Sequence, residues 1–367
     1  MFQDFDRASG LVDERAAMAR ALELAWRGWG RAWPNPLVGA VVLRDGAIVG
    51  EGWHAEYGGP HAEPVALAAA GDRARGATLV VTLEPCVHQG KTPPCAEAVA
   101  NAGVSRVVIA LADPNPIASG GADRLRAAGV DVSIGLLGDE AAAQNAAFLR
   151  LIGDESRPFV ALKLATSIDF KIADRQGRSR WISGEAAREF VHWLRAGFDA
   201  IAVGLGTARA DDPALTARGT PAPRLPLRRI VFDRDLDLPF GLRLVTDNPA
   251  STTVIGGPAA DAAREQALVT HGVRVLRAAG PASALARLRD DGVGSLLVEG
   301  GGRLAGALLR DGLVDRFYWI QSPIWLGDAG VPAVRGLESS EVNRAERWRI
   351  VERRALGPDA LLVLDRR

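Results

Sequence analysis

The sequence has 367 residues and carries 44 basic and 44 acidic side chains, so its formal net charge at pH 7 is zero. A balanced charge provides no long-range attraction to nucleic acid or to a membrane surface. The first residues show neither the basic start nor the apolar run of a signal peptide, and no apolar stretch approaches the roughly 20 residues of a membrane span. We therefore expect a cytoplasmic protein of two domains, because the chain is longer than a usual single domain.

The first 150 or so residues alternate between helical and strand patterns. Asp13 suits the N-cap of a helix that reaches about Gly28, because alanines and leucines follow it at helical spacing. Residues 44–47, Arg-Asp-Gly-Ala, predict a hairpin turn. Strands are expected at residues 37–43, 48–53, 78–83, 107–111 and 131–135, and helices at 61–70, from 93 onward and at 122–128. This alternation is typical of a layered α/β domain with a largely parallel sheet, whose ligands lie outside the carboxyl ends of the strands.

One histidine and two cysteines lie in a pattern that suits a catalytic zinc ion. His61 begins a helix, Cys86 follows a strand, and Cys95 begins the next helix after two prolines. One imidazole and two thiolates leave the fourth position of a tetrahedral zinc open for water, whose pKa falls to about 7 there. Glu63 is placed to carry a proton from that water to a leaving amine. The pattern is close to the His-x-Glu and Pro-Cys-x-x-Cys signature of zinc-dependent base deaminases, with a longer loop between the cysteines.

The same residues would also fit simpler structural roles. A single His-x-Glu occurs by chance on many helices, and two cysteines can be small buried apolar side chains or, in a secreted protein, a disulfide. Both cysteines of the chain fall in this stretch, and three of its five histidines lie in or beside it (His54, His61 and His88). We therefore favour the zinc site.

A polar segment with a proline, residues 153–158, is the best candidate for a linker, and we predict domains at residues 1–152 and 158–367. A second α/β unit follows, with strands expected at residues 159–165, 200–203, 229–232, 252–255, 273–276, 295–298 and 317–321. Glu299-Gly300-Gly301-Gly302 precedes a helix expected from Arg303 to Arg310, whose free N–H groups would suit a phosphate. The glycines could equally serve a tight turn alone, so their spacing leaves phosphate binding open.

Together these motifs resemble one family closely, the bifunctional deaminase–reductase of riboflavin biosynthesis. The resemblance runs from about Ala16 to Leu337. It rests on motifs at residues 34–39, 61–63, 84–95 and 113–116 in the first half, and at 163–165, 179–182, 203–207, 210–218 and 299–301 in the second. It implies an α/β protein with an N-terminal cytidine-deaminase-like α/β/α layered domain and a C-terminal domain similar to dihydrofolate reductase.

The resemblance also implies two reactions on a small pyrimidine ribosyl phosphate. The first domain would hydrolyse the 2-amino group of 2,5-diamino-6-ribosylamino-4(3H)-pyrimidinone 5′-phosphate. The second would use NADPH to reduce the ribosyl group to ribityl. By motif position, the zinc ligands would be His61, Cys86 and Cys95, and the catalytic proton shuttle would be Glu63. We also expect a homo-oligomer.

Further positions follow from the same motifs. The deaminase substrate would be held by Asn35, His54, His88, Lys91, Asp113 and Asn115. NADPH would be bound by Ala165, Trp181, Thr207 and Asp211, and by one turn made of Gly301, Gly302, Arg303, Leu304, Ala305, Gly306 and Ala307. The reductase substrate would be held by Ser179, Arg195, Leu215, Arg218 and Glu299. Arginines can bind phosphate oxygens in a bidentate manner, although most arginines are solvated surface charges.

The chain departs from the family pattern in three places. Phe170 stands where the family usually has glycine, so a turn with positive φ would be strained there. Residues 118–121 look shorter than usual, and residues 154–157 differ from the usual linker. Two rivals therefore remain: a deaminase whose second domain only binds a ligand or a partner, and a nucleic-acid base deaminase. The balanced charge counts against the second rival, because binding the phosphate backbone needs clustered Lys and Arg.

Overall fold

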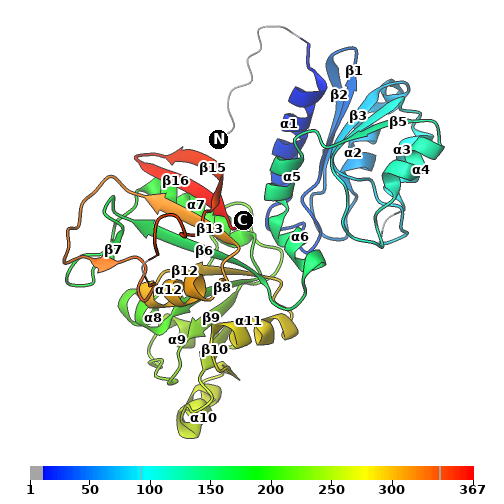
Figure 1. Cartoon of the computed structure of the whole chain (residues 1–367). Helices are drawn as coiled ribbons and strands as arrows, with labels where there is room; N and C mark the ends of the chain where they lie inside the picture. The colour runs from blue at the N-terminus through cyan, green and yellow to red at the C-terminus, as the bar shows by residue number, and fades with distance from the viewer. Residues whose placement is uncertain (1–10, 92, 339) are drawn as a thin grey trace. The chain divides into compact units, whose positions relative to one another are not determined.

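The computed structural model describes residues 11–91, 93–338 and 340–367 and divides into two compact units (Figure 1). The first unit ends at Gly153 and the second begins at Asp154. The expected linker lies at this division, between helix α6 (Ala146–Gly153) and strand β6 (Phe159–Thr166). Among the described helices, none combines the length and the apolar character that a membrane span requires.

The first unit is built on a five-stranded sheet in the order β2-β1-β3-β4-β5. Its strands are β1 (Gly39–Arg44), β2 (Ala47–Trp53), β3 (Thr78–Leu83), β4 (Arg106–Leu111) and β5 (Asp131–Ile134). Strands β3, β4 and β5 are parallel, whereas β1 is antiparallel to both β2 and β3. The sheet is therefore only half parallel, which corrects the expectation. The predicted hairpin at Asp45 and Gly46 accounts for the antiparallel pairing of β1 with β2, because its positive φ angles of 51° and 74° suit a tight two-residue turn.

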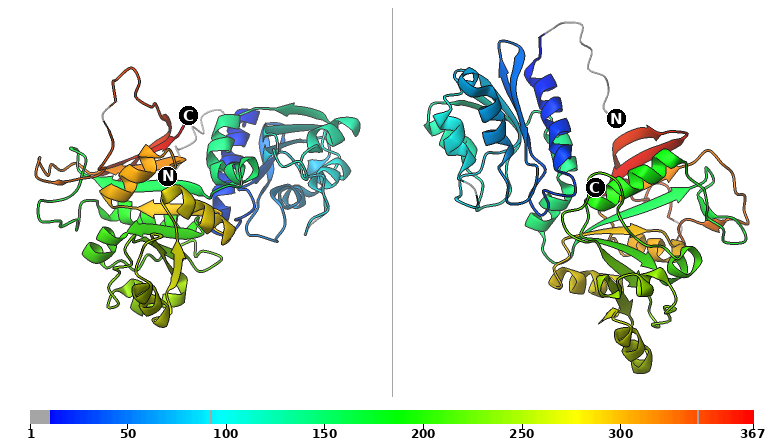
Figure 2. Two further views of the ribbon diagram at one scale, coloured as in Figure 1. Left: turned by 60° about the horizontal axis from the view of Figure 1, so that its bottom comes forward. Right: turned by 180° about the vertical axis from the view of Figure 1, so that it is seen from behind.

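Helices cover both faces of this sheet (Figure 2). The buried side chains of α1 (Glu14–Ala25) and α5 (Gly138–Gln144) share one apolar cluster with Val80 of β3. Those of α2 (Ala62–Ala70), α3 (Cys95–Asn101) and α4 (Gly121–Ala127) share another with Val81, the next residue along the same strand. Neighbouring residues of a strand point to opposite faces, so the unit has the predicted α/β/α layers.

Glycine in β2 lets helix α2 approach the sheet very closely. A Cβ atom on Gly52 would lie 2.3 Å from the carbonyl oxygen of Ala62, and one on Gly50 would lie 2.3 Å from that of Ala66. Real Cβ atoms do not come this close to backbone atoms, so both positions require glycine. This close contact fixes the start of α2, where His61 and Glu63 lie.

The second unit contains a nine-stranded sheet in the order β11-β10-β9-β8-β12-β6-β13-β16-β15. Its strands after β6 are β8 (Ala200–Gly204), β9 (Arg228–Phe232), β10 (Thr252–Gly256), β11 (Arg274–Arg277), β12 (Ser295–Glu299), β13 (Arg316–Gln321), β15 (Arg349–Leu356) and β16 (Asp359–Asp365). All pairings from β11 to β13 are parallel, and β16 and β15 then add two antiparallel strands. A separate pair joins β7 (Lys171–Ala173) to β14 (Val331–Pro332).

Two apolar clusters lie on the two faces of this sheet. Ala202 of β8 packs in the cluster that includes α11 (Pro281–Asp290) and α12 (Gly302–Arg310). Its neighbour Val203 packs in the cluster that includes α8 (Leu205–Asp211), α9 (Arg243–Thr246) and α10 (Ala262–Thr270). Helix α7 (Glu185–Ala196) lies between β7 and β8 in the chain, and its Phe190 ring lies 6.4 Å from that of Tyr318 in β13. Short 3₁₀ turns complete the elements at Trp26–Gly28, Gly71–Ala74 and Pro249–Ser251.

Phe170 adopts the conformation that its glycine-like position suggested, with φ at 59°. A non-glycine residue there costs about 1–3 kcal/mol. Its ring is partly buried in the core and makes an edge-to-face contact with Trp319 at 5.5 Å, and burial of an aromatic side chain offsets a cost of this size. Phe170 is not among the residues that line the cavity of this unit. The phenylalanine at this position therefore contributes to the core and not to the wall of the cavity.

Candidate active sites

Three elements of the first unit bring the expected metal ligands together. His61 is the N-cap of α2, Cys86 follows the carboxyl end of β3, and Cys95 is the first residue of α3. The Nδ1 atom of His61 lies 3.2 Å from the Sγ atom of Cys95 and 3.7 Å from that of Cys86. All three donor atoms lie within 4.8 Å of one another.

This geometry fits a tetrahedral zinc ion. Zinc binds imidazole nitrogen at about 2.0 Å and thiolate sulfur at about 2.3 Å, so two ligand atoms on one ion lie roughly 3.5–4 Å apart. A hydrogen bond with Cys95 lowers the pKa of the Cys86 thiol to about 4. The same contact and burial raise the pKa of Cys95. Both shifts arise because the two sulfurs lie close together, as two ligands of one cation would.

Glu63 lies beside this cluster, in the first turn of α2, and is 3% exposed. Burial raises the pKa of its carboxyl group to about 7. Its Oε2 atom is buried and has no hydrogen-bond partner among the described residues. A carboxyl group that titrates near neutrality is suited to accept a proton and to release it again.

The cluster opens into a cavity of about 260 Å³. All six residues predicted to hold the deaminase substrate line it, and they come from four separate segments of the chain: Asn35, His54, His88, Lys91, Asp113 and Asn115. The Nζ atom of Lys91 lies 3.9 Å from the centre of the Tyr57 ring, as a cation–π contact. The Nδ1 atom of His88 is buried and has no partner among the described residues.

His54 orients its neighbour Asn35. Its Nδ1 atom lies 2.9 Å from the carbonyl oxygen of Pro60, and its Nε2 atom lies 3.1 Å from the Asn35 side-chain amide. The carbonyl can only accept, so Nδ1 carries the hydrogen and Nε2 accepts from the amide. Burial lowers the pKa of His54, which keeps the ring neutral and this arrangement intact.

The lining residues that had no predicted role include Tyr57, Glu84 and Phe148. The carboxylate of Glu84 accepts hydrogen bonds from the backbone N–H groups of Asp113, Gly120 and Ala122 at 2.8–3.2 Å. It thereby fixes the short loop that carries Asp113 and Asn115. Its place directly before Pro85-Cys86 is a signal that could have identified it. Phe148 comes from α6, the helix that directly precedes the linker.

The second unit has a larger and more open cavity of about 610 Å³. It is lined by all five residues predicted to hold the reductase substrate, and by five predicted to hold NADPH: Ala165, Trp181, Thr207, Asp211 and Gly301. The Ser179 hydroxyl donates to the Asp211 carboxylate at 3.0 Å. Trp181 is 70% exposed, and the Arg188 guanidinium stacks on its ring at 4.6 Å.

Most of the predicted cofactor turn lies in the helix that was expected from Arg303 to Arg310. Gly301 is the N-cap of α12, and the six residues after it, Gly302 to Ala307, belong to the helix itself. Leu304 and Ala305 pack in the core, and a Cβ atom on Gly306 would lie 1.8 Å from the carbonyl oxygen of Arg335. Of the seven residues, only Gly301 lines the cavity. Gly300 and Gly301 have φ angles of 72° and 85°, so this bend does require glycine.

Glu299 lies at the carboxyl end of β12 and pairs with two cations. Its carboxylate accepts from Arg195 at 2.5 and 2.9 Å and from Lys163 at 3.4 Å. Burial disfavours its ionisation, but Arg195 and Lys163 overcome this effect and hold the pKa of Glu299 at about 2. The guanidinium fork of Arg195 therefore faces Glu299, where the sequence had suggested a phosphate.

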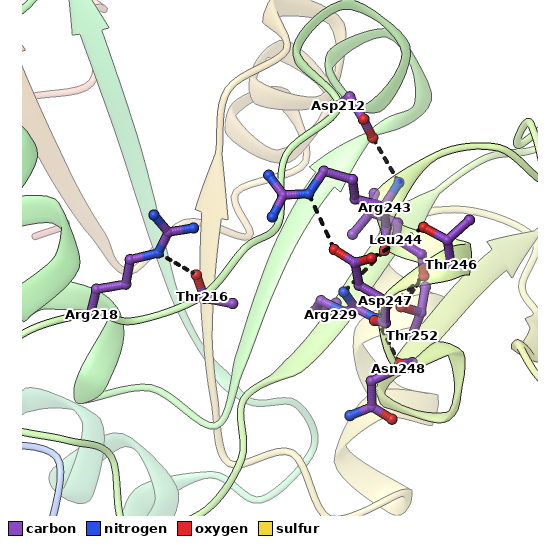
Figure 3. Close-up of polar contacts among 10 residues, drawn as sticks. All are labelled: Asp212, Thr216, Arg218, Arg229, Arg243, Leu244, Thr246, Asp247, Asn248 and Thr252. Carbon is purple, nitrogen blue, oxygen red and sulfur yellow. Dashed lines mark hydrogen bonds and ion pairs between the residues drawn. The ribbon is translucent and has the colours of Figure 1, made fainter.

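The segment after α8 holds the other predicted arginine (Figure 3). The Nε atom of Arg218 donates to the Thr216 hydroxyl at 3.2 Å, which is its one hydrogen bond with a described side chain. Arg243 donates to Asp247 at 3.2 Å, and its own backbone N–H is bound by Asp212. Arg229 is buried and donates to the carbonyl groups at the end of α9. Arg229 thus has a structural role, while Arg218 remains exposed at the cavity.

Comparison with known proteins connects the two sites. A family model of the cytidine and deoxycytidylate deaminase zinc-binding region matches residues 12–111, and one of the RibD C-terminal domain matches residues 158–362. The riboflavin biosynthesis protein RibD of Mycobacterium tuberculosis is 44% identical over 361 residues, which cover 96% of this chain and 97% of that protein. RibD of Escherichia coli is 40% identical over 365 residues, which cover 95% and 98%. This chain belongs to the RibD family.

Solved structures agree with this assignment. RibD from Acinetobacter baumannii is 36% identical, covers 96% of this chain and 99% of its own, and superposes with a TM-score of 0.79. A protein of Thermotoga maritima, described as a diaminohydroxyphosphoribosylaminopyrimidine deaminase/5-amino-6-(5-phosphoribosylamino)uracil reductase, is 35% identical with the same coverage and a TM-score of 0.78.

The family assignment confirms the main predictions from the sequence. This RibD chain is a bifunctional enzyme of riboflavin biosynthesis, with a zinc-dependent deaminase domain and a reductase domain that uses NADPH. The predicted fold classes of both domains are likewise confirmed. Neither rival, the nucleic-acid base deaminase or the non-catalytic second domain, is favoured by these relatives.

Proposed function

We propose that the first domain, residues 1–152, deaminates 2,5-diamino-6-ribosylamino-4(3H)-pyrimidinone 5′-phosphate, and that the second, residues 158–367, reduces the ribosyl group of the product. The activities named for the Thermotoga maritima protein support these substrates. The observation that carries the proposal is the His61, Cys86 and Cys95 cluster with the buried Glu63 at its side.

In the deaminase, His61, Cys86 and Cys95 would hold the zinc ion. Zinc, when bound, lowers the pKa of water toward neutrality, which hydrolytic deamination requires. Glu63 takes a proton from the attacking water and delivers it to the departing amine, so that water enters and ammonia leaves. Its unpaired Oε2 atom and its pKa near 7 support this role.

The cavity around Glu63 orients the pyrimidine. Asn35, held by His54, and Asp113 with Asn115 supply hydrogen-bonding groups to the polar ring edge. Lys91 and His88 lie on the loop between the two cysteines and bind the phosphate of this substrate. The cation–π contact of Lys91 with Tyr57 leaves its ammonium donors able to face the cavity.

In the reductase, NADPH, when bound, would supply a hydride to C1′ of the sugar in its ring-opened imine form, while the imine nitrogen would gain a proton from solvent. Asp211, Thr207, Trp181 and Ala165 bind the cofactor, and the backbone N–H groups at the start of α12 take a cofactor phosphate. The backbone N–H of Ala305 already donates to the carbonyl oxygen of Gly301, so we expect the phosphate to be bound by the first-turn residues Gly302, Arg303 and Leu304.

Five residues hold the substrate of the reductase. Glu299 lies beside the ribose, and Arg195 orients this carboxylate while its remaining N–H groups face the substrate. Arg218 binds the phosphate, and Ser179 and Leu215 complete the wall of the cavity.

One experiment tests both halves in the full-length protein. Cys86→Ser removes a zinc ligand, so we expect loss of zinc and of deamination, with NADPH oxidation on the deaminated ribosylaminouracil phosphate largely unchanged. Metal analysis and NADPH absorbance provide the readouts. A variant that lacks zinc but deaminates normally contradicts the first half. A wild-type protein that does not oxidise NADPH with this substrate contradicts the second and favours a non-catalytic domain.

Two broader expectations stay predictions. Assembly as a homo-oligomer is tested by light scattering coupled to size-exclusion chromatography. A cytoplasmic location is tested by cell fractionation.

A further inference from the structure

Helix α7 presents three basic side chains to the reductase cavity. Arg188, His192 and Arg195 follow each other at intervals of four and three residues and therefore lie on one face of the helix. All three line the cavity. Arg188 stacks on Trp181 and Arg195 pairs with Glu299. The half-buried His192, which lies between them, has no role in the function proposed above.

The hydrogen bonds of His192 determine which ring nitrogen can titrate. Its Nδ1 atom lies 3.1 Å from the carbonyl oxygen of Thr216, which also accepts from Arg195 at 2.9 Å. A carbonyl oxygen only accepts, so Nδ1 carries a hydrogen in every protonation state of the ring. Nε2 is therefore the atom that gains or loses the proton.

Charged groups on three sides surround this imidazole. Burial, Arg195 and Arg218 lower the pKa of His192, while the Thr216 carbonyl and Glu299 act in the opposite direction. The negative charge of Glu299 is balanced by the positive charges of Arg195 and of Lys163 in β6. Arg188, Glu185 and Glu189 of the same helix also line the cavity. At pH 7 and without an anion nearby, the ring is mostly neutral.

We propose that His192 binds the phosphate group of the reductase substrate together with Arg218, and that its imidazole takes up a proton as the phosphate binds. Thr216 joins the two residues, because its carbonyl oxygen accepts from His192. Its hydroxyl accepts from Arg218 (Figure 3). This inference rests on the proposed reductase function. It assigns to His192 part of the binding that Arg195, whose fork is occupied by Glu299, does not supply.

Phosphate binding and protonation of His192 are coupled electrostatically. A phosphate monoester carries a charge of about −1.5 to −2 at pH 7, so its arrival next to Arg218 reverses the field that His192 experiences. The pKa of the imidazole then rises, and Nε2 acquires the proton with which it donates to a phosphate oxygen. Between the pKa of the free enzyme, below 6.5, and that of the complex, binding takes up one proton. In this range the affinity falls by up to tenfold per pH unit as the pH rises.

The test measures steady-state kinetics of the full-length protein with saturating NADPH and the deaminated ribosylaminouracil phosphate from pH 7 to 9, where the dianion is the main form of the phosphate. For the wild type we expect KM to rise about tenfold and then level off, while kcat changes little. His192→Asn retains a side-chain N–H for the Thr216 carbonyl but cannot protonate. Its KM should be about tenfold higher at pH 7 and independent of pH, with an unchanged KM for NADPH.

Two controls isolate the effect. His271→Gln alters the other histidine of this unit, an exposed one that directly follows α10 and does not line the cavity, and it should keep the wild-type profile. The same substrate without its phosphate should bind more weakly to the wild type, with a KM that does not change with pH. If His192→Asn loses NADPH binding and is therefore misfolded, calorimetry of product binding to the wild type in buffers of different ionisation enthalpy replaces it. About one proton should be taken up at pH 7.5.

The outcomes are distinct. A His192→Asn variant with the wild-type KM and pH profile overturns the inference, as does a pH-dependent KM for the phosphate-free substrate or the absence of proton uptake in calorimetry. If the wild type oxidises no NADPH at any pH, the proposed reductase function itself fails.

Discussion

A buried glutamate lies at the reaction centre proposed for each domain, and the pKa values of the two are shifted in opposite directions. Glu63 of the deaminase is 3% exposed and Glu299 of the reductase 7% exposed. Glu63 has an unpaired oxygen among the described residues, and burial raises its pKa to about 7. Glu299 has the cations of Arg195 and Lys163 beside it and a pKa of about 2. Burial is the same in both cases, so the neighbouring charges decide whether a carboxyl group can exchange protons.

The difference corresponds to the two reactions. Hydrolytic deamination moves protons, and a group that titrates near pH 7 can both accept and donate them. Hydride transfer needs the substrate held in contact with the cofactor, and a carboxylate that stays ionised is a constant acceptor for sugar hydroxyls. We therefore expect removal of the Glu63 carboxylate to abolish proton transfer, and removal of the Glu299 carboxylate to reduce stability and substrate binding.

The largest effect is expected for Glu63→Gln. The amide cannot shuttle protons, so deamination should fall by about 10²–10⁴, while zinc content and reductase activity stay at wild-type levels. Metal analysis and separate assays of the two reactions measure this. Glu97→Gln is the matched control, since Glu97 is an exposed residue of α3. Deamination near the wild-type rate would show that another group, such as His88, moves the proton.

Glu299→Gln should act mainly on structure and substrate binding in the second domain. It leaves Arg195 and Lys163 without their anion in a buried place, which costs roughly 3–5 kcal/mol in the free energy of unfolding. Reductase activity should fall and deaminase activity persist. The control is Glu265→Gln, which breaks a more exposed pair with Arg277 and should cost about 1 kcal/mol or less. Similar losses for both variants would refute the contrast between buried and exposed pairs.

The low pKa of Glu299 also predicts how stability depends on pH. The carboxyl pKa is about 2 in the folded protein and 4.5 in the reference state, so ionisation contributes roughly 3 kcal/mol above pH 4.5 at about 1.4 kcal/mol per unit. This contribution is lost as the pH falls from 4.5 toward 2. Urea unfolding of the wild type and Glu299→Gln should therefore show a stability difference that narrows by about 1 kcal/mol between pH 6 and 4. A constant difference would argue against a depressed pKa.

Of the three substitutions, Arg218→Ala is expected to have the smallest effect, because Arg218 is exposed and contacts only the Thr216 hydroxyl among described side chains. Loss of a charge-assisted phosphate contact costs about 1.5–3 kcal/mol. The KM for the reductase substrate should rise ten- to a hundredfold, with stability and the KM for NADPH nearly unchanged. Arg234→Ala, a change of another exposed arginine outside the cavity, is the control. An equal loss of NADPH affinity in Arg218→Ala would place this arginine in the cofactor site.

The sequence was sufficient to predict those parts of the site in which each residue belongs to a motif that is local in the chain. The zinc cluster was predictable because each ligand lies at the end of an element with a strong local signal: proline before α2 and α3, and an unbroken apolar run in β3. The environment of Glu299 was not predictable. Lys163 and Arg195 lie 136 and 104 positions away in the chain, and only the pairing of β6 with β12 and the packing of α7 bring them together.

Prediction of the fold had the same limit, because only elements with a strong local pattern were found. Buried parallel strands such as β8 and β12 were predicted within one residue at each end, because continuous apolar runs mark them. The hairpin of β15 and β16 was missed because β15, Arg-Ile-Val-Glu-Arg-Arg-Ala-Leu, has charged residues at half of its positions and lies mostly exposed. The half-antiparallel first sheet was misjudged for another reason: pairing direction depends on which strands become neighbours, and local pattern does not contain this information.

The position of β16 has a consequence for how the enzyme is made. Residues 359–365 form an interior strand between β13 and β15, and Asp365 pairs with the buried Arg316. The nine-stranded sheet therefore cannot close until the ribosome has passed residue 365, and until then β13 exposes an unpaired edge. The deaminase unit is contiguous and has all its strands by residue 134. During synthesis the zinc ligands can thus assemble in a domain folded while the reductase is still an unfinished nascent chain.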